Sequence, residues 1–280
     1  MPAIPASSSP DPIAFIGGGN MARSLIGALI RNGADAKSIT VAEPNESLRA
    51  ALASDFGVGV DADARGAAQH AGLLVFAVKP QVLKTVCGDL ADFVAARTPI
   101  VISIAAGIRI AQLREWLGVD LPIVRAMPNT PALIGAGATG LFANALADAG
   151  QRAHAEAILA SAGRTVWIER EDLMDTVTAL SGSGPAYFFL LVEALEDAAV
   201  AQGLSRETAR VLATQTCLGA GRMLVEDGEA PATLRERVTS PGGTTAAALD
   251  AFAGGHLREL VTRAVAAATQ RGQELSEQFS

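Results

Sequence analysis

The chain has few aromatic residues, cysteines and histidines. Only 4% of its 280 residues are aromatic while 50% are hydrophobic, so a core must be built mainly from Ala, Val, Leu and Ile. The two cysteines, Cys87 and Cys217, lie far apart and in no metal-ligand spacing, and the three histidines are scattered. We therefore expect no metal site and no Cys–His catalysis, and we interpret both cysteines as small buried residues in a reducing compartment.

An excess of positive charge is also missing. The formal net charge is −7 and the isoelectric point is near 5.0. This argues against nucleic acid as a partner, because phosphate neutralisation needs a basic surface. A small anionic ligand remains compatible with an acidic chain, since a few backbone N–H groups can hold one carboxylate or phosphate.

Long hydrophobic runs are absent as well. No stretch of about 20 residues is continuously apolar, so no membrane span is expected. Residues 1–10 are rich in Pro and Ser and lack the basic start and apolar run of a signal peptide. We interpret them as a flexible tail and expect a cytoplasmic protein.

Short β-branched runs alternate with helix-like segments over residues 11–170. This alternation predicts an α/β domain with a parallel, doubly wound sheet of the Rossmann-like type. The expected strands are Ile13–Ile16, Ile39–Ala42, Leu73–Val78, Ile100–Ile104, Ile123–Arg125 and Thr165–Ile168. The expected helices are Met21–Asn32, Asn45–Phe56, Gln81–Asp92 and Ile110–Leu117.

Strand signals stop at residue 171, and residues 171–280 predict an all-α domain. Proline at the start and glycine past the end bound the first long helix. The expected helices are Pro185–Gln202, Arg206–Glu226, Ala232–Val238, Thr244–Phe252 and Leu257–Gln270. We interpret the small residues of Ser181–Ala186 as allowing close packing of the first of these helices.

A glycine-rich turn connects the first strand to the first helix, in the pattern Gly17-x-Gly19-x-x-Ala22. Gly17 permits the tight turn, Gly19 lets backbone N–H groups approach a pyrophosphate, and Ala22 lets the helix pack on the sheet. The alternative is a tight turn without a ligand, but the flanking strand and helix favour a dinucleotide. The expected cofactor contacts here are Ile16, Gly17, Gly18, Gly19, Asn20, Met21 and Ala22.

The end of the second strand bears on the type of cofactor. Glu43 lies where an acid often binds the ribose hydroxyls of NAD. Asn45 and Arg49 are close enough to help bind the 2′-phosphate of NADP, so the residues leave the choice open. On later loops Lys79 is equally consistent with a ribose or phosphate contact and with an ordinary surface lysine, and Asn129 is a candidate partner for the nicotinamide amide.

A second glycine-rich loop, Val238–Thr245, interrupts the helical half and is followed at once by a helix. Glycines and hydroxyls at a helix start form a concave set of N–H donors that suits a carboxylate. Ordinary Ser/Thr capping is the alternative. Two glycines with several hydroxyls exceed what a cap needs, so ligand binding is favoured.

The helical half contains no lysine, because all three lysines precede residue 85. Reduction of a carbonyl leaves an alkoxide that needs an acid of suitable pKa, which two-domain hydroxyacid dehydrogenases often take from a lysine. A cyclic imine is more basic and enters as an iminium that already accepts hydride. A hydroxyl such as that of Thr245, or a water molecule, would then suffice as proton relay.

Together these motifs resemble the pyrroline-5-carboxylate reductase family. The segments that carry the resemblance are Phe15–Ala22, Ala77–Gln81, Arg125–Ala132, Ser181–Tyr187 and Ser240–Thr245. They follow the family's order and span residues 11–270. The resemblance implies a Rossmann-like domain, a helical dimerisation domain, and a homodimer that assembles into a larger ring. It also implies that the substrate loop of one subunit faces the cofactor of the other.

The resemblance further implies roles for individual residues in reducing L-1-pyrroline-5-carboxylate to L-proline, the last step of proline biosynthesis. Thr245 matches the hydroxyl that hydrogen-bonds the imine nitrogen, and Glu171 approaches the ring nitrogen from the domain junction. Substrate contacts are expected from Ser240, Gly242, Gly243, Thr244, Thr245 and Glu171. Further cofactor contacts are expected from Glu43, Asn45, Ala64, Val78, Lys79, Pro80, Ala105 and Asn129.

Two departures from the family pattern concern the cofactor. Ala64 replaces an asparagine that some relatives have near the adenosine, and Glu43 replaces a small polar residue. NADPH, the family's usual donor, is favoured and NADH stays open. Two alternatives to the assigned function remain: a related imine or keto-acid reductase of the same architecture, and a non-catalytic nucleotide sensor that needs no carboxylate pocket.

Overall fold

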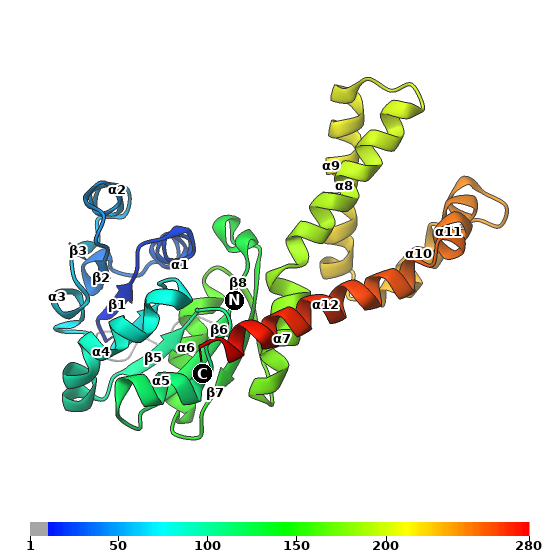
Figure 1. Cartoon of the computed structure of the whole chain (residues 1–280). Helices are drawn as coiled ribbons and strands as arrows, with labels where there is room; N and C mark the ends of the chain where they lie inside the picture. Colours follow the sequence, from blue (N-terminus) through cyan, green and yellow to red (C-terminus); the bar gives the residue numbers. More distant parts are fainter. Residues whose placement is uncertain (1–10, 280) are drawn as a thin grey trace. The chain divides into compact units, whose positions relative to one another are not determined.

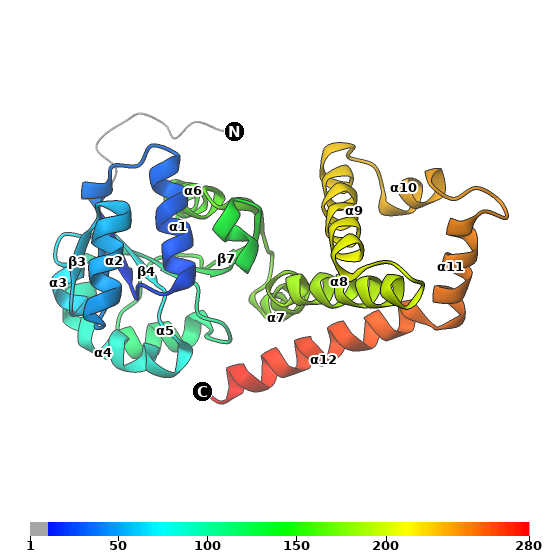
Figure 2. The same ribbon diagram turned by 90° about the horizontal axis from the view of Figure 1, so that it is seen from above.

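The computed structural model describes residues 11–279 and divides them into two compact units. Unit 1 contains residues 11–182 and 268–279, and unit 2 contains residues 183–267. Figures 1 and 2 show a sheet with helices in unit 1 and helices alone in unit 2. The tail predicted for residues 1–10 lies outside the described residues.

Unit 1 is built on an eight-stranded sheet with the order β3-β2-β1-β4-β5-β6-β7-β8. Neighbouring strands from β3 to β6 are parallel, β7 is antiparallel to β6, and β8 is parallel to β7. Every residue of β1, β4 and β5 is buried, because a parallel sheet is covered on both faces. The strands are β1 (Ile13–Ile16), β2 (Ile39–Ala42), β3 (Gly59–Asp61), β4 (Leu73–Phe76), β5 (Ile100–Ser103), β6 (Ile123–Met127), β7 (Gly137–Ala143) and β8 (Gly163–Trp167).

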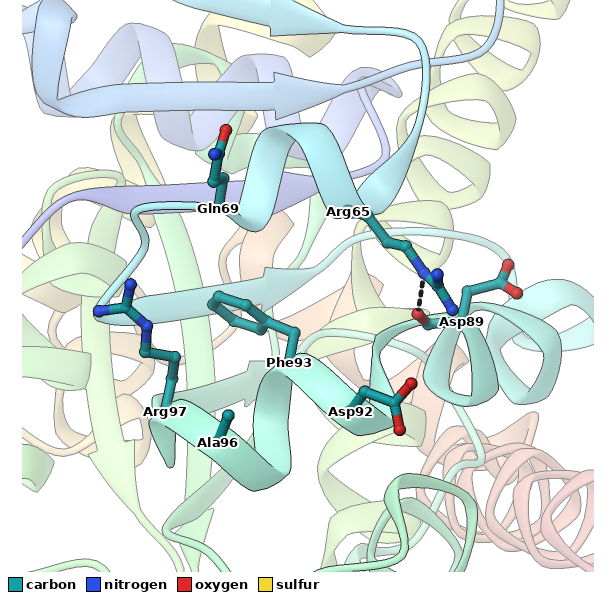
Figure 3. A pocket seen from close by; sticks show the side chains of 7 residues that line it. All are labelled: Arg65, Gln69, Asp89, Asp92, Phe93, Ala96 and Arg97. Atoms are coloured by element: carbon teal, nitrogen blue, oxygen red, sulfur yellow. Dashed lines mark hydrogen bonds between the residues drawn. The ribbon is translucent and has the colours of Figure 1, made fainter.

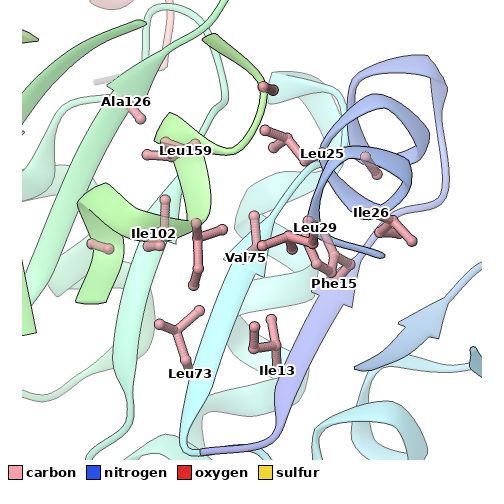
Figure 4. Packing of buried hydrophobic residues seen from close by; sticks show 14 of the residues in the cluster. Ile13, Phe15, Leu25, Ile26, Leu29, Leu73, Val75, Ile102, Ala126 and Leu159 are labelled. Atoms are coloured by element: carbon pink, nitrogen blue, oxygen red, sulfur yellow. The ribbon is translucent and has the colours of Figure 1, made fainter. Parts of the chain in front are cut away.

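Helices cover both faces of this sheet, and successive strand residues point alternately into the two cores. On one face Phe15 and Val75 pack against Leu25 and Leu29 of α1 (Figure 4), and α2 and α6 join the same core. On the other face Phe76 belongs to a core shared with α3, α4 and α5. The helices are α1 (Asn20–Arg31), α2 (Glu46–Phe56), α3 (Ala64–Ala68), α4 (Pro80–Arg97), α5 (Ile110–Leu117) and α6 (Ala149–Ala160).

Unit 2 consists of helices with few buried apolar side chains. Helices α8 and α9 pack against each other, and Arg206 and Arg210 of α9 both pair with Glu196 of α8. No helix within residues 11–279 is long and apolar enough to cross a membrane. The helices are α8 (Gly184–Ala201), α9 (Arg206–Glu226), α10 (Pro231–Arg237), α11 (Thr244–Gly254) and α12 (Leu257–Glu277), whose last part belongs to unit 1.

The predicted fold class is confirmed, and β1, β2, α5 and α9 coincide with their predicted ranges. The strands β3 and β7 and the helices α3 and α6 were not predicted from the sequence. In β7 the glycines hide the strand pattern, yet they are required by packing, since a Cβ on Gly140 would lie 2.5 Å from Val177 Cγ1. The strand β3 has only three residues and begins with Gly59, which gives no β-branched run to detect.

The segment between the sheet and the long helices packs with unit 1. It comprises η3 (Glu171–Leu173), α7 (Met174–Val177) and the π-helical turn η4 (Thr178–Gly182). Met174 and Asp175 are buried there. The predicted helical domain starts at residue 171, whereas the compact units divide after Gly182. Glu171 and Asp175 pair with Arg125 of β6, which ties this segment to unit 1.

Candidate active site

The loops expected to bind a cofactor gather at the carboxyl edge of the sheet. They follow β1, β2, β3, β4, β5 and β6, which are adjacent and parallel. The strand order reverses between β1 and β4, and open α/β sheets bind ligands outside such a switch point. The fold therefore brings the predicted residues from Ile16 to Asn129 to one edge, although they are far apart in the sequence.

The three glycines after β1 have different surroundings. Gly17 has a φ of +106°, and a Cβ there would lie 2.9 Å from the carbonyl carbon of Ala77. A Cβ on Gly18 would lie 2.6 Å from Leu52 Cδ1. Gly19, in contrast, is exposed and would place a Cβ in open space. Packing within the protein requires glycine at the first two positions. At Gly19 no protein atom fills the space beside the backbone, which leaves room for a ligand.

The start of α1 is suited to an anion. Gly19 occupies the N-cap and no side chain caps the helix, so the first backbone N–H groups are not satisfied by a capping side chain. Ala22 is buried against the sheet, as its small size predicts, and Met21 packs beside it. Exposed Gly19 and Asn20 therefore border a helix N-terminus that can hold a pyrophosphate.

Glu43 is committed to backbone partners within the protein. It is buried, and its carboxylate accepts hydrogen bonds from the N–H groups of Gly18 and Asn45, both at 3.0 Å. Arg49 donates to the carbonyls of Glu43 and Pro44, at 2.8 and 2.7 Å. The side chain of Asn45 caps α2. These bonds favour a role for Glu43 in shaping the glycine loop over a direct contact to ribose.

The loops after β3, β4 and β5 complete this edge. Val78 is half-buried and its side chain lies against Gly17, while Lys79 is exposed at the N-cap of α4 and Pro80 is its first residue. Ala105 is buried, and its N–H donates to Ser103 Oγ. Ala64 is the first residue of α3. Val78 and Ala105 thus contribute apolar side chains to this edge of the sheet, and the side chain of Lys79 lies in solvent.

Asn129 is held at both ends of its amide. Its Nδ2 donates to the carbonyl of Ser181 at 2.9 Å, and its Oδ1 accepts from the N–H of Ala138 at 2.9 Å. The residue is only 8% exposed. The structure therefore gives this side chain partners in the protein backbone, in addition to any nicotinamide contact that the sequence suggested.

Glu171 also has partners inside unit 1. Its Oε1 accepts from the N–H of Ile110 at 2.7 Å, at the start of α5, and lies 3.3 Å from Arg125 Nη1. Asp175 faces the same guanidinium at 3.6 Å. The side chains of Arg125 and Asp175 are each 4% exposed. Arg125 and Asp175 were not among the residues predicted from the sequence, although an arginine inside an apolar strand is itself a signal of a buried partner.

The predicted substrate loop lies in unit 2. Gly242 has a φ of +68°, and the N–H of Gly243 donates to the carbonyl of Ser240 at 3.0 Å, which forms a tight turn before α11. No side chain caps α11, so its hydroxyls are not used as an ordinary cap. Thr244 is exposed and Thr245 half-buried at this helix start. The loop thus retains the donors that a carboxylate needs.

A surface hollow of about 370 Å³ lies elsewhere, between α3 and the second half of α4 (Figure 3). Arg65 there donates to the carbonyl of Asp89, and Phe93 is among the residues that line the hollow. Asp89 follows Pro80 by nine residues of helix, or roughly 13 Å, which separates the hollow from the loop Val78–Pro80. The residues described contain no cluster of His, Cys, Asp and Glu suited to a metal ion.

Two family models match the chain. Residues 12–107 match the family described as NADP oxidoreductase, coenzyme F420-dependent, and residues 171–275 match the family described as pyrroline-5-carboxylate reductase dimerisation. With the doubly wound sheet and the open glycine loop, the first match defines the class: the protein is a nicotinamide-dinucleotide-dependent oxidoreductase.

Relatives narrow this class. The pyrroline-5-carboxylate reductase of Pseudomonas aeruginosa is 48% identical over 267 residues, covering 95% of this chain and 97% of that protein. The enzyme of that name from Arabidopsis thaliana is 37% identical over 278 residues, covering 99% and 100%. The chain belongs to the pyrroline-5-carboxylate reductase family, and the resemblance drawn from the motifs is confirmed.

Solved structures agree with this assignment. A pyrroline-5-carboxylate reductase from Coxiella burnetii superposes with a TM-score of 0.92 at 45% identity, covering 95% of this chain and 99% of that one. The Plasmodium falciparum enzyme, whose structure has NADP bound, gives a TM-score of 0.82 at 29% identity over 95% and 98%. The cofactor expected from the sequence, a nicotinamide dinucleotide, is supported by these findings.

Proposed function

We propose that the protein reduces L-1-pyrroline-5-carboxylate to L-proline with NADPH, with NADH as a second donor, as the last step of proline biosynthesis. The observation that carries the proposal is that a member of this family has two helix starts that no side chain caps. One follows Gly19 and suits a pyrophosphate, and the other follows Gly243 and suits a carboxylate. A nucleotide sensor would need only the first.

The residues at the carboxyl edge fit a dinucleotide. The open space at Gly19 admits a pyrophosphate, the side chain of Val78 lies against Gly17, and buried Ala105 follows the neighbouring strand β5. When bound, the cofactor supplies the hydride that its nicotinamide C4 transfers to the imine carbon. The protein contributes orientation, because holding two rings in contact lowers the barrier without further chemistry.

The residues of the second loop bind and orient the substrate. Backbone N–H groups of Gly242 and Thr244, with the hydroxyl of Ser240, hold its carboxylate, while Gly243, whose own N–H donates to the carbonyl of Ser240, forms the tight turn that presents them. The Thr245 hydroxyl hydrogen-bonds the ring nitrogen, which carries a proton as the iminium and becomes the amine of proline. We assign Glu171 to holding the start of α5 rather than to the ring nitrogen, because its carboxylate already accepts from Ile110 and faces Arg125.

The matched dimerisation family and the apolar side chains exposed on unit 2 support a homodimer formed through this unit. We further propose that dimers assemble into a larger ring and that the enzyme is cytoplasmic. The partner it acts on is a small molecule, not nucleic acid, consistent with the acidic chain.

The deciding experiment is oxidation of NADPH and of NADH by the purified protein with racemic pyrroline-5-carboxylate, followed by absorbance and by analysis for proline. Rapid oxidation with proline as product is expected, and the ratio of the two rates gives the cofactor preference. Cofactor binding without oxidation would reject the substrate and lead to other imines and keto acids. Failure with all of these would favour the sensor.

The role of Thr245 is tested in the same assay. Thr245→Ala removes the proposed hydrogen bond to the ring nitrogen, and turnover should fall by about tenfold to a hundredfold. Thr262→Ala is the matched control, because its exposed hydroxyl bonds only to the carbonyl of Arg258 in α12. Unchanged turnover of Thr245→Ala at saturating substrate would remove Thr245 from the mechanism.

A further inference from the structure

The chain passes from unit 1 to unit 2 directly after the π-helical turn η4. Turns of this type are rare and are frequently found at functional sites. In η4 the hydroxyls of Thr178 and Ser181 bond to carbonyls four residues earlier, at 2.8 and 2.9 Å. The turn leads directly into α8, whose second residue is Pro185.

Pro185 removes one hydrogen-bond donor from the crossing, the segment Thr178–Pro185 in which the chain passes from unit 1 to unit 2. In an uninterrupted α-helix the carbonyl of Ser181 would accept from the N–H of residue 185. Proline has no N–H, so this acceptor loses its ordinary donor. The amide of Asn129 supplies a donor in its place, at 2.9 Å. Without this donor the fold would be destabilised, because the carbonyl would give up its hydrogen bond to water and gain none in return.

The loop after β6 contacts the crossing at a second point. A Cβ on Gly182 would lie 2.7 Å from Met127 Cε, so the turn and the end of β6 are in close contact. Asn129 is in turn fixed from the sheet side, because its Oδ1 accepts from Ala138 of β7. The amide thus connects β7 to the last carbonyls of unit 1 through a buried side chain.

We infer that Asn129 is a positioning residue: it replaces the donor that Pro185 removes and thereby fixes the start of α8, the first helix of the unit that carries the substrate loop. The inference rests on the proposed function where it concerns catalysis. It differs from the nicotinamide contact suggested by the sequence, because the partner of the amide nitrogen is a backbone carbonyl of the crossing.

The test is a double-mutant cycle with Asn129→Ala, Pro185→Ala and both together. Asn129→Ala should lower kcat by about tenfold, because a small misplacement far from the chemistry is costly, and should leave the KM for NADPH within about twofold. Pro185→Ala should change activity by less than about twofold. In the double variant the new N–H can serve Ser181, so at least about threefold of the lost activity should return.

Asn144 provides a matched control at the other end of β6. Its Oδ1 accepts from the N–H of Ile123 at 3.2 Å, and its Nδ2 donates to the carbonyl of Leu121 at 2.8 Å. Asn144→Ala therefore loses the same two kinds of bond away from the crossing. It should lower stability to a similar extent and leave kcat unchanged.

A readout without catalysis separates this inference from the proposed function. Amide hydrogen exchange over residues 183–190 should be faster in Asn129→Ala, return toward the wild type in the double variant, and stay unchanged in Asn144→Ala. If the wild type does not reduce the imine, the proposed function fails and exchange alone decides. Should Asn129→Ala not fold, Asn129→Asp replaces it, because Asp keeps the acceptor for Ala138.

Two outcomes would overturn the inference. A raised KM for NADPH with unchanged exchange would make Asn129 a cofactor contact. Effects of the two substitutions that simply multiply, in activity and in exchange, would show that Asn129 and Pro185 are not coupled.

Discussion

At the residue scale, the three glycines after β1 differ in whether contacts within the protein require them. Gly17 combines a positive φ with close contact to the carbonyl of Ala77, and Gly18 fits between Leu52 and Glu43. Gly19 has an ordinary φ of −68° and no neighbour within 4 Å of a Cβ. Packing therefore does not explain its small size, which is consistent with the proposed pyrophosphate contact.

Gly19→Ala should leave the free energy of unfolding unchanged and weaken the binding of the cofactor. The methyl group would enter the space that we propose for the pyrophosphate, so the Kd for NADPH should rise by about tenfold or more, equivalent to about 1.4 kcal/mol. Gly17→Ala should instead destabilise the protein by about 1–3 kcal/mol because of its backbone conformation. Denaturant unfolding and cofactor titration of both variants check this. Equal loss of stability in both would contradict it.

The thiol of Cys87 should be inert in the folded enzyme. Burial in the core beneath α4 raises the pKa of this thiol to about 12, so almost no reactive thiolate forms near neutral pH. Mass spectrometry after iodoacetamide treatment should find Cys87 unmodified in the native protein and modified after unfolding in guanidinium. Modification of Cys87 without unfolding would refute the expectation.

At the element scale, a buried ionic cluster joins β6, the start of α5 and the segment before α8. Arg125 faces both Glu171 and Asp175. Arg125→Met should destabilise unit 1 by about 3–5 kcal/mol, because it leaves two partly or fully buried carboxylates without their counter-ion. Arg170→Met should cost less than about 1 kcal/mol, since its pair with Asp172 is exposed. If denaturant unfolding gave the same loss of stability for both variants, the buried cluster would not contribute more than an exposed ion pair.

A second ionic group joins α8 to α9 and should make stability depend on pH. The hydrogen bond from Arg210, together with that from Arg206, holds the pKa of Glu196 below its ordinary value of 4.5. Since the folded pKa is the lower one, this stabilisation is complete above pH 4.5 and is lost as pH falls through the folded pKa.

Glu196→Gln should accordingly be less stable than the wild type at neutral pH, and the difference in thermal unfolding should shrink as the solution is acidified below the ordinary pKa. A difference that stays constant with pH would show that the charge of Glu196 is not involved.

At the scale of the whole molecule, unit 2 exposes more apolar surface than a monomer is expected to tolerate. Side chains on α8 and α9 account for much of it: Phe188, Phe189, Leu190, Leu191, Leu195, Val211, Leu212, Leu218, Met223, Leu224 and Val225. This pattern fits a helical unit that completes its core with a second copy, as the dimerisation family implies.

Phe189→Glu should therefore dissociate the oligomer, because a carboxylate placed in an apolar interface is costly to desolvate. Light scattering should give the mass of a monomer, 28.6 kDa, where the wild type gives a multiple of it. Val166→Glu is the control: Val166 is 62% exposed against 68% for Phe189, but lies on the edge strand β8 of unit 1. An intact oligomer in Phe189→Glu would exclude α8 from the interface.

Much of the architecture could be predicted from the sequence, because runs of apolar residues and the glycines between them mark most strands and turns. The run Ile13–Ile16 is continuously apolar and is buried on both faces, and the glycines that follow it mark the turn into α1. The strand β7 could not be predicted in this way, because Gly137 and Gly140 carry no side-chain pattern and are chosen by contacts with Ala162 and Val177.

The sequence by itself determined the class of fold, the order of the motifs and the two glycine-rich helix starts that no side chain caps. Only the tertiary structure decided the partners of Glu43, Asn129 and Glu171, which turn to Gly18, Ser181 and Arg125. The reason is physical: a buried polar side chain bonds to whatever group the fold brings beside it, and these partners lie 25, 52 and 46 residues away in the sequence.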